Sequence, residues 1–347
     1  MKATSVEVNC GSSDLSGVSD AIYVVHADQG GQDSNACGGT LATACATIEK
    51  GLSQCGFSRC DAVLVGYGKY VPTTSLGVYN VNLYGGCLQK SRDTTGLRSL
   101  IQAAPGGAPA VIAAGAGPLM QMQNFKISAS SASSPGGSSI AFLVKDTRMS
   151  IAQSQFYASY GGSGEKGCDG CITTQAETAC SGQSITNVGG TPSSNTKGAF
   201  SDSSWTWSGS QGGDGFAGYV LKHGALVNGG GGGKQGGGSF AVVIANATVQ
   251  ISSSRIAGGR GGDGGSGGGN GVALAVLAAL GAGAGGNGGP AIGIATVGSG
   301  QHSFDSVVYD LGIGGAGGKP PENNASFSAC LQGQDGSIGI EPAQQSF

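Results

Sequence analysis

The chain has 347 residues, of which 70 are glycine; only 11% are charged, and the formal net charge is −3. Average soluble proteins contain about 7% glycine and about 25% charged residues. A disordered chain would carry more charge and fewer large aliphatic residues. The sequence has no basic stripe, which argues against nucleic acid or an anionic membrane as a partner. The longest apolar run, residues 272–284, is too short for a membrane-spanning helix.

The first hundred residues predict short strands around one helix. Residues 21–25 have strand composition, and residues 45–52 have the apolar spacing of a helix. Two further strands are expected at residues 61–66 and 78–86, with residues 68–70 between them.

This order resembles the opening of a known family of secreted bacterial proteins. The segments that carry the resemblance are YVV, GGQDSNACGGTLATACATIEKGL, DAVLVGYGKY and VNLYGG. They resemble pectin-lyase-like right-handed parallel β-helices, in which a P-x-x-T-I cap helix precedes a V-x-V-x-x-G-x-Y strand. Cys45 stands where that family often has proline or cysteine, before Thr47 and Ile48. The resemblance covers about residues 20–130 and implies a fold, not a reaction.

The rest of the chain contains an internal repeat. Residues 139–162 align without a gap with residues 239–262, and a third copy begins at residue 291. Each copy consists of two short apolar strands followed by a glycine tract. This pattern is typical of solenoid rungs in which one corner is extended into a long excursion.

The glycine tracts have a three-residue period. It is clearest in residues 258–269, with shorter tracts at 229–238, 285–290 and 314–319. A polyproline II helix has three residues per turn, so Gly-Gly-X leaves two edges bare for close backbone packing. A flexible linker is the alternative. The alternation with apolar segments favours packed ribs, and the apolar residues 272–280 are either a buried helix or a buried rib.

These observations predict an all-β fold, a right-handed parallel β-helix with glycine-rich polyproline II excursions packed on one face. An opening region, residues 1–130, carries the cap helix, and residues 131–347 form the rungs and excursions. The two parts are expected to form one continuous unit.

The ten cysteines indicate an oxidising compartment, because an even number scattered through a low-charge chain suits disulfides. The spacing favours local bridges from Cys37 to Cys45 and from Cys55 to Cys60. The other candidates are three cysteines that would staple the first excursion and three with long-range partners: Cys168, Cys171, Cys180, Cys10, Cys87 and Cys330. Zinc at the C-x-x-C pair is the alternative, without the second pair that makes such a signal strong. We therefore expect a secreted protein whose leader has been removed, because residues 1–20 lack the apolar core of a signal peptide.

Catalytic motifs are missing from the sequence. Glycoside hydrolases need paired carboxylates, and polysaccharide lyases need clustered aspartates with a basic residue. Asp146 and Arg148 would share a face of one strand, and we interpret them as a surface ion pair. His223 is interpreted as a surface residue. Three aspartates in the opening region do not have the spacing of a calcium loop: Asp14, Asp28 and Asp33. No cofactor or metal is predicted.

Aromatic residues in the first excursion suggest a binding role. Trp205 and Trp207 would point the same way from a strand, near Phe216 and Tyr219. Exposed, these four would form a platform for a sugar or a protein; buried, they would anchor the ribs. We predict a non-enzymatic structural or adhesive surface protein that binds surface glycan or assembles with itself. Self-assembly through repeated contacts would produce a fibre. The alternatives are a polysaccharide lyase or glycoside hydrolase, and an ice-binding protein.

Overall fold

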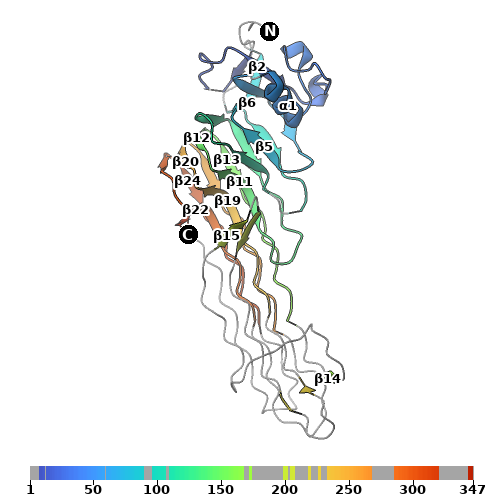
Figure 1. The fold of residues 1–347 in the computed structure, drawn as a ribbon, viewed down its shortest axis with the longest axis vertical. Helices are drawn as coiled ribbons and strands as arrows, with labels where there is room; N and C mark the ends of the chain where they lie inside the picture. Colours follow the sequence, from blue (N-terminus) through green and yellow to red (C-terminus); the bar gives the residue numbers. More distant parts are fainter. Residues whose placement is uncertain are drawn as a thin grey trace.

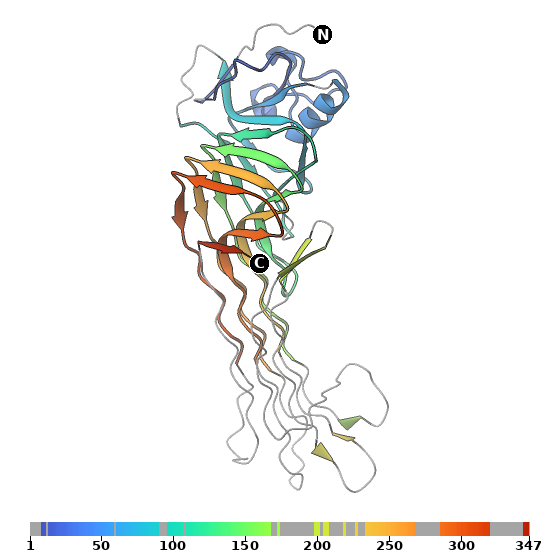
Figure 2. The ribbon, with the colours of Figure 1, turned by 60° about the vertical axis from the view of Figure 1, so that its left-hand side comes forward.

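The computed structural model describes residues 8–11, 13–58, 60–89, 96–106, 109–167, 233–267, 285–319 and 343–346, and five short strands between residues 172 and 227. The molecule is elongated (Figure 1). A body of stacked strands carries one helix at its N-terminal end, and glycine-rich segments run side by side away from the body (Figure 2). Most described strands lie in parallel sheets, so the fold is all-β with few helices. No helix in the described part of the chain is long and apolar enough to cross a membrane.

The first sheet has eight strands, of which seven are parallel. In sheet order they are β2 (Ala21–Val24), β3 (Ala62–Gly66), β6 (Asn82–Gln89), β9 (Met120–Gln123), β12 (Arg148–Ala152), β20 (Thr248–Ser252) and β23 (His302–Asp305). The eighth strand, β1 (Val8–Cys10), pairs antiparallel with β6.

Two further parallel sheets have six strands each. The second sheet consists of β4 (Lys69–Tyr70), β7 (Ser99–Gln102), β10 (Phe125–Ser128), β13 (Gln155–Tyr157), β21 (Arg255–Ala257) and β24 (Val308–Asp310). The third consists of β5 (Leu76–Tyr79), β8 (Val111–Ala114), β11 (Ser139–Lys145), β19 (Ser239–Ala245), β22 (Ala291–Val297) and β25 (Gln344–Ser346).

The chain visits the three sheets in turn, so each circuit stacks on the one before it. The predicted repeat is confirmed residue by residue: Ser139 pairs with Ser239, and Ser239 pairs with Ala291. The second strand of each copy keeps the same register, with Ile151 opposite Ile251. Equivalent residues of successive copies therefore lie directly above one another.

This register builds a main core of stacked apolar side chains. Phe142 and Phe156 are fully buried, and their rings stack with centroids 5.4 Å apart. The main cluster of buried residues extends from Ile22 to Ile294, across both predicted parts of the chain. Burial of each large apolar side chain contributes roughly 1.5–3 kcal/mol, which offsets the entropy lost by the ordered backbone.

Short polar residues turn the corners between the sheets. Asn80 has a φ of 52° and Asp146 a φ of 50°, in the left-handed region that asparagine and aspartate tolerate. The single strand expected at residues 78–86 was wrong, because the turn at Asn80 divides it into β5 and β6. The backbone N–H of Asp146 donates to the carbonyl oxygen of Ala245, 3.0 Å away, so the corners also stack.

A compact cap covers the N-terminal end of the stack. Helix α1 (Ile48–Ser58) packs with β2, β3 and β5, and two short 3-10 helices, η1 (Ala27–Gln29) and η2 (Leu41–Thr43), precede it. The helix was expected at residues 45–52; Cys45 instead forms a β-bridge with Val24. The structure forms disulfides between Cys37 and Cys45, between Cys55 and Cys60, and between Cys10 and Cys87.

The described glycine tracts pack against each other through their backbones. Hydrogen bonds between neighbouring tracts recur every three residues, which is the period of a polyproline II helix. One such series has the N–H groups of Gly161, Gly164 and Gly167 donating to the carbonyl oxygens of Arg260, Asp263 and Ser266, over 2.8, 2.7 and 2.8 Å. Another has Gly261, Gly264 and Gly267 donating to Ile313, Ala316 and Lys319, over 2.9, 2.8 and 3.0 Å. The prediction of packed rather than loose tracts is confirmed for these residues.

The first excursion contributes two small antiparallel sheets. One consists of β14 (Ile172–Thr173), β18 (Leu226–Val227) and β17 (Gly218–Tyr219), and the other of β15 (Gly198–Ser201) and β16 (Ser204–Trp207). Strand β15 lies near the body, whereas β14 lies at the far end of the glycine-rich segments (Figure 1). The apolar segment 272–280, expected as a helix or a rib, lies outside the described residues.

Candidate functional site

The acid–base pair singled out in the sequence does not lie on one strand. Asp146 occupies the corner between β11 and β12, whereas Arg148 begins β12. The carboxylate of Asp146 lies 3.9 Å from the Nζ of Lys145; the Asp146 side chain is exposed and that of Lys145 is partly buried. The expected partner was therefore wrong, because the left-handed turn at Asp146 takes it out of the alternation of the strand. An exposed pair beside a turn is a surface feature without catalytic geometry.

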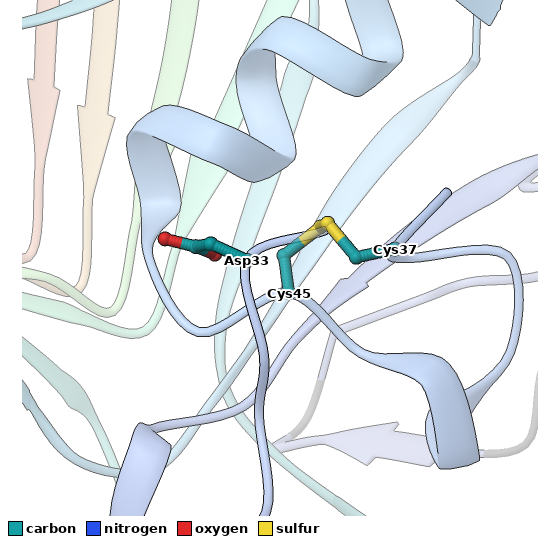
Figure 3. A group of neighbouring side chains, drawn as sticks. All are labelled: Asp33, Cys37 and Cys45. Carbon is teal, nitrogen blue, oxygen red and sulfur yellow. A yellow bond between two sulfur atoms is a disulfide. The ribbon is translucent and has the colours of Figure 1, made fainter. Parts of the chain in front are cut away.

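Asp33, Cys37 and Cys45 gather where a metal ion could be expected (Figure 3). The two sulfur atoms are joined in a disulfide, so neither offers a thiolate. The carboxylate of Asp33 accepts the backbone N–H groups of Ala46 and Thr47, at 2.8 and 3.1 Å, and the Thr47 hydroxyl at 2.8 Å. Asp33 thus holds the two residues before α1 in place, and the Thr47 oxygen caps the helix by accepting the backbone N–H of Lys50 at 3.2 Å.

The other metal candidates do not assemble. The carboxylate of Asp14 accepts the backbone N–H of Ser16, which lowers the pKa of Asp14. Asp28 lies 3.2 Å from the Nδ1 of His26. Each aspartate therefore serves its own turn. The zinc alternative involved Cys168, Cys171 and Cys180 of the first excursion, which lie outside the described residues. Cys330 and His223 lie outside them as well.

The predicted aromatic platform is divided between two sheets. Trp205 and Trp207 both lie in β16, opposite Phe200 and Gly198. Tyr219 lies in β17, which pairs with β18 in the other small sheet. Phe216 is among the residues whose placement is not described. The backbone therefore groups the two tryptophans but does not bring Tyr219 into their sheet.

An exposed surface on the second sheet has more of the features of a binding site. We call it the outer strip, and define it by five side chains: Lys126, Tyr157, Tyr160, Arg255 and Arg260. Strands β10, β13 and β21 carry Lys126, Tyr157 and Arg255 on one outward surface. Phe156 and Ile256 turn inward, so their neighbours in the strand turn outward. The strip continues onto the glycine tracts, where Tyr160 pairs with Arg260 in a parallel bridge.

One aromatic ring of the outer strip lies against a cation. The Nζ of Lys126 lies 4.8 Å from the ring centroid of Tyr157, a cation–π distance. Tyr160, which forms a backbone bridge with Arg260, is 59% exposed. Sugar rings bind to exposed aromatic rings through their C–H faces, and charged neighbours supply donors to their hydroxyl groups. The strip offers both kinds of group.

Ion pairs hold the arginines of the outer strip in place. The Nε of Arg255 donates to the carboxylate of Asp310, and this hydrogen bond, with the negative charge, raises the pKa of Arg255. The Nη2 of Arg260 lies 2.9 Å from the carboxylate of Asp263, which also accepts the backbone N–H of Ala316 at 2.9 Å. Both pairs are about half exposed, so they position the side chains more than they stabilise the fold.

A groove of about 420 Å³ lies at the other end of the body, between α1 and β5. Its lining includes Leu52, the Cys55–Cys60 disulfide, and Tyr79, which is 60% exposed. The ring of Tyr79 lies over Gly77, where a Cβ would approach ring atoms to 2.6–3.0 Å. The groove is largely apolar and has no charged group in its lining.

The outer strip was not predicted from the sequence. The 100-residue alignment does predict part of it, because it places Tyr157 opposite Ala257 and Tyr160 opposite Arg260 on neighbouring layers. Lys126 could not have been added, since β10 lies before the repeat begins.

Comparisons with known proteins do not identify a family. No protein-family model and no curated protein sequence matches this chain. Among solved structures, the catalytic domain of a GH87 alpha-1,3-glucanase in complex with nigerose aligns at 11% identity with a TM-score of 0.14. The alignment covers 76% of this chain and 64% of that chain. A similarity at this level carries no argument about fold or activity.

Proposed function

We propose that this protein is a non-enzymatic extracellular structural or adhesive protein that binds surface glycan through the outer strip. Its scaffold in this proposal is a right-handed parallel β-helix related to the pectin-lyase-like family, and its glycine tracts are packed polyproline II ribs. The observation that carries the adhesive role is the contact of Lys126 with the ring of Tyr157 on the same outward surface as the exposed Tyr160.

The order of the strands supports the proposed scaffold. Successive strands β7, β8 and β9 belong to the second, third and first sheets, and β10, β11 and β12 repeat that order. A chain that returns to each sheet after one circuit has the connectivity of a three-sided solenoid. The flat outer faces of such a scaffold suit an extended ligand.

The packing of the ribs supports a rigid mount for the strip. The Arg255–Asp310 ion pair joins β21 to β24, and Asp263, which pairs with Arg260 in the same tract, accepts the backbone N–H of Ala316 from the neighbouring tract. The positions of the charged groups are therefore set before a ligand arrives. Preorganisation of this kind reduces the entropy lost on binding. Three disulfides in the described residues support an extracellular location.

Binding to immobilised polysaccharides tests the proposal. Pectin, alginate, hyaluronan, chitin and an α-glucan are suitable probes, with retention measured by affinity electrophoresis and bond cleavage by release of reducing ends. We expect retention on at least one polymer without cleavage. Replacing both tyrosines of the strip (Tyr157→Ala and Tyr160→Ala) should weaken retention at least about ten-fold, because each stacked ring contributes on the order of 1 kcal/mol.

Tyr79→Ala is the matched control, since Tyr79 is as exposed as Tyr160 but lies at the groove beside α1. Loss of retention in this variant alone would assign the ligand to the groove and overturn the proposed surface. Turnover of any polymer would overturn the non-enzymatic assignment. Absence of retention on every probe, with the fold intact, would count against an adhesive role for glycans of these classes.

A further inference from the structure

Cations recur on alternate strands of the second sheet. One residue of each strand lies in a single row across the sheet, which we call the cation row: Lys69, Leu100, Lys126, Gln155, Arg255 and Val308. The residues that follow the first five of these in their strands are buried: Tyr70, Ile101, Ile127, Phe156 and Ile256. Because side chains alternate along a strand, the cation row faces outward. Lys69, Lys126 and Arg255 occupy its first, third and fifth positions.

The spacing of these cations follows from the spacing of the strands. Neighbouring strands lie about 4.8 Å apart, so cations on alternate strands recur about every 9.6 Å along the stack. An extended pyranose disaccharide has a similar length. Between the cations, Leu100 is apolar and partly buried, and Gln155 carries an uncharged amide. The row therefore offers one cation for every second sugar of a polymer that lies along it.

The cations of the row are able to bind anionic groups. Within the described part of the chain, neither Lys69 nor Lys126 forms an ion pair with a carboxylate, and Lys126 lies over the ring of Tyr157 instead. Arg255 donates to Asp310 through its Nε, and the Nη edge of its planar guanidinium suits a second carboxylate. The whole chain has a net charge of −3, so the row is a local concentration of positive charge.

We infer that the ligand of the outer strip is an extended acidic polysaccharide with one carboxylate on every second sugar. The inference rests on the proposed glycan binding and names the class of its ligand. The charged sugars lie against Lys69, Lys126 and Arg255. The uncharged sugars between them lie against Leu100 and Gln155. A polymer with a carboxylate on every sugar would place half of its charges beside these two uncharged side chains, where they would lose water without gaining a cation.

Tyr157 connects the cation row with the stacking role proposed for the outer strip. It lies two residues after Gln155 on the same face of β13, and its hydroxyl donates to the amide oxygen of Gln155 at 3.2 Å. The uncharged sugar over Gln155 is therefore the one within reach of the Tyr157 ring. Stacking and ion pairing thus fall on alternate sugars of the same polymer.

Isothermal titration with hexasaccharides of different charge spacing tests the inference. Hyaluronan carries one carboxylate per disaccharide, polygalacturonate carries one on every sugar, and carboxyl-reduced hyaluronan carries none. We expect the dissociation constant for the hyaluronan hexasaccharide to be at least about ten-fold lower than for the other two. It should rise with the salt concentration, because salt screens ion pairs at an exposed surface.

A pair of double variants tests the residues of the row. Lys69→Gln/Lys126→Gln should raise the dissociation constant for hyaluronan at least about ten-fold and reduce the preference over polygalacturonate. Lys50→Gln/Lys145→Gln is the matched control, because it removes the same charge from α1 and β11, outside the second sheet. The control should leave the dissociation constant unchanged. All four lysines are at least partly exposed, so circular dichroism of both variants should remain that of the unchanged protein.

The outcomes separate this inference from the proposed function. Equal affinity for hyaluronan and polygalacturonate would overturn the inference, as would equal effects of the two double variants. Single-stranded DNA bound as tightly as hyaluronan would also overturn it, because it would show attraction for any polyanion. If the protein binds none of the acidic sugars, the inference fails. Retention of a neutral α-glucan that is lost in Tyr157→Ala would then leave the proposed function standing, and its absence would count against both.

Discussion

The carbonyl oxygen of Gly289 occupies the space that a side chain on Gly261 would need: a Cβ on Gly261 would be 1.9 Å from that oxygen. Real Cβ atoms essentially never lie within 3.0 Å of a non-bonded heavy atom. Gly264 has the same relationship with Gly286, also at 1.9 Å. The neighbouring atoms are backbone, which cannot move aside as a flexible side chain would. The three-residue period of the tract therefore reflects contact between backbones.

The first prediction concerns this contact. Gly261→Ala should lower the melting temperature, with a cost of at least about 1–3 kcal/mol, because the added methyl group overpacks the bundle. Ser266→Ala, in the same tract, is the control and should cost little, since Ser266 is partly exposed. In a flexible linker both changes would be tolerated, and the glycine change would even be slightly stabilising. Equal melting temperatures for the two variants would contradict the packed bundle.

Asp33 gives the second prediction. Asp33→Ala should lower the urea midpoint of unfolding by the equivalent of about 1–2 kcal/mol, because the N–H groups of Ala46 and Thr47 lose their acceptor. Asp28→Ala is the control, since its side chain is 87% exposed. A metal chelator should leave the midpoint of the unchanged protein where it is. A shift with the chelator that disappears in Asp33→Ala would identify a metal site instead.

The third prediction compares two disulfides by the length of chain that each closes. The Cys10–Cys87 bridge spans 77 residues and the Cys55–Cys60 bridge spans 5. In the chain-entropy description, replacing both cysteines by alanine should cost about 4 kcal/mol for the first and about 2 kcal/mol for the second. Thermal unfolding of the two double variants measures the difference. The opposite order would mean that residues 8–10 add little to the fold, or that strain dominates.

The pH dependence of stability gives the fourth prediction, through Asp61. The Ser19 hydroxyl donates to the Asp61 carboxylate at 2.7 Å, and the backbone N–H groups of Asp20 and Ser19 donate at 3.0 Å, which together hold the pKa of Asp61 below 3.8. A lowered folded-state pKa contributes stability above the unfolded-state pKa, and this contribution is lost as the pH falls through the folded value.

Asp61→Asn should therefore be less stable than the unchanged protein at about pH 7, and the difference should shrink at about pH 3. Urea unfolding at the two pH values measures this. Asp20→Asn is a suitable control, because the Asp20 side chain takes no part in these hydrogen bonds. A difference that stays constant with pH would show that the carboxylate charge at position 61 does not matter.

Several features of the fold follow from the sequence because they are repeated along it. Ser139 pairs with Ser239 and then with Ala291, as the 100-residue alignment predicts, because stacked layers need the same apolar positions at the same offsets. The glycine period predicts backbone contact for a similar reason: where backbones touch on two edges, every residue on those edges must lack a side chain.

The tertiary structure decided what depends on a completed circuit of the chain. No local pattern divides β5 from β6 at Asn80, since the turn is set by where the third sheet meets the first. The outer strip arises only when β10, β13 and β21 stack and bring Lys126 over Tyr157. The capped end likewise exists only because the stack has an order, which brings α1 against β2, β3 and β5. The sequence by itself determined which residues stack, because stacking repeats a local pattern, whereas the faces and ends of the stack are relationships between segments far apart in the chain.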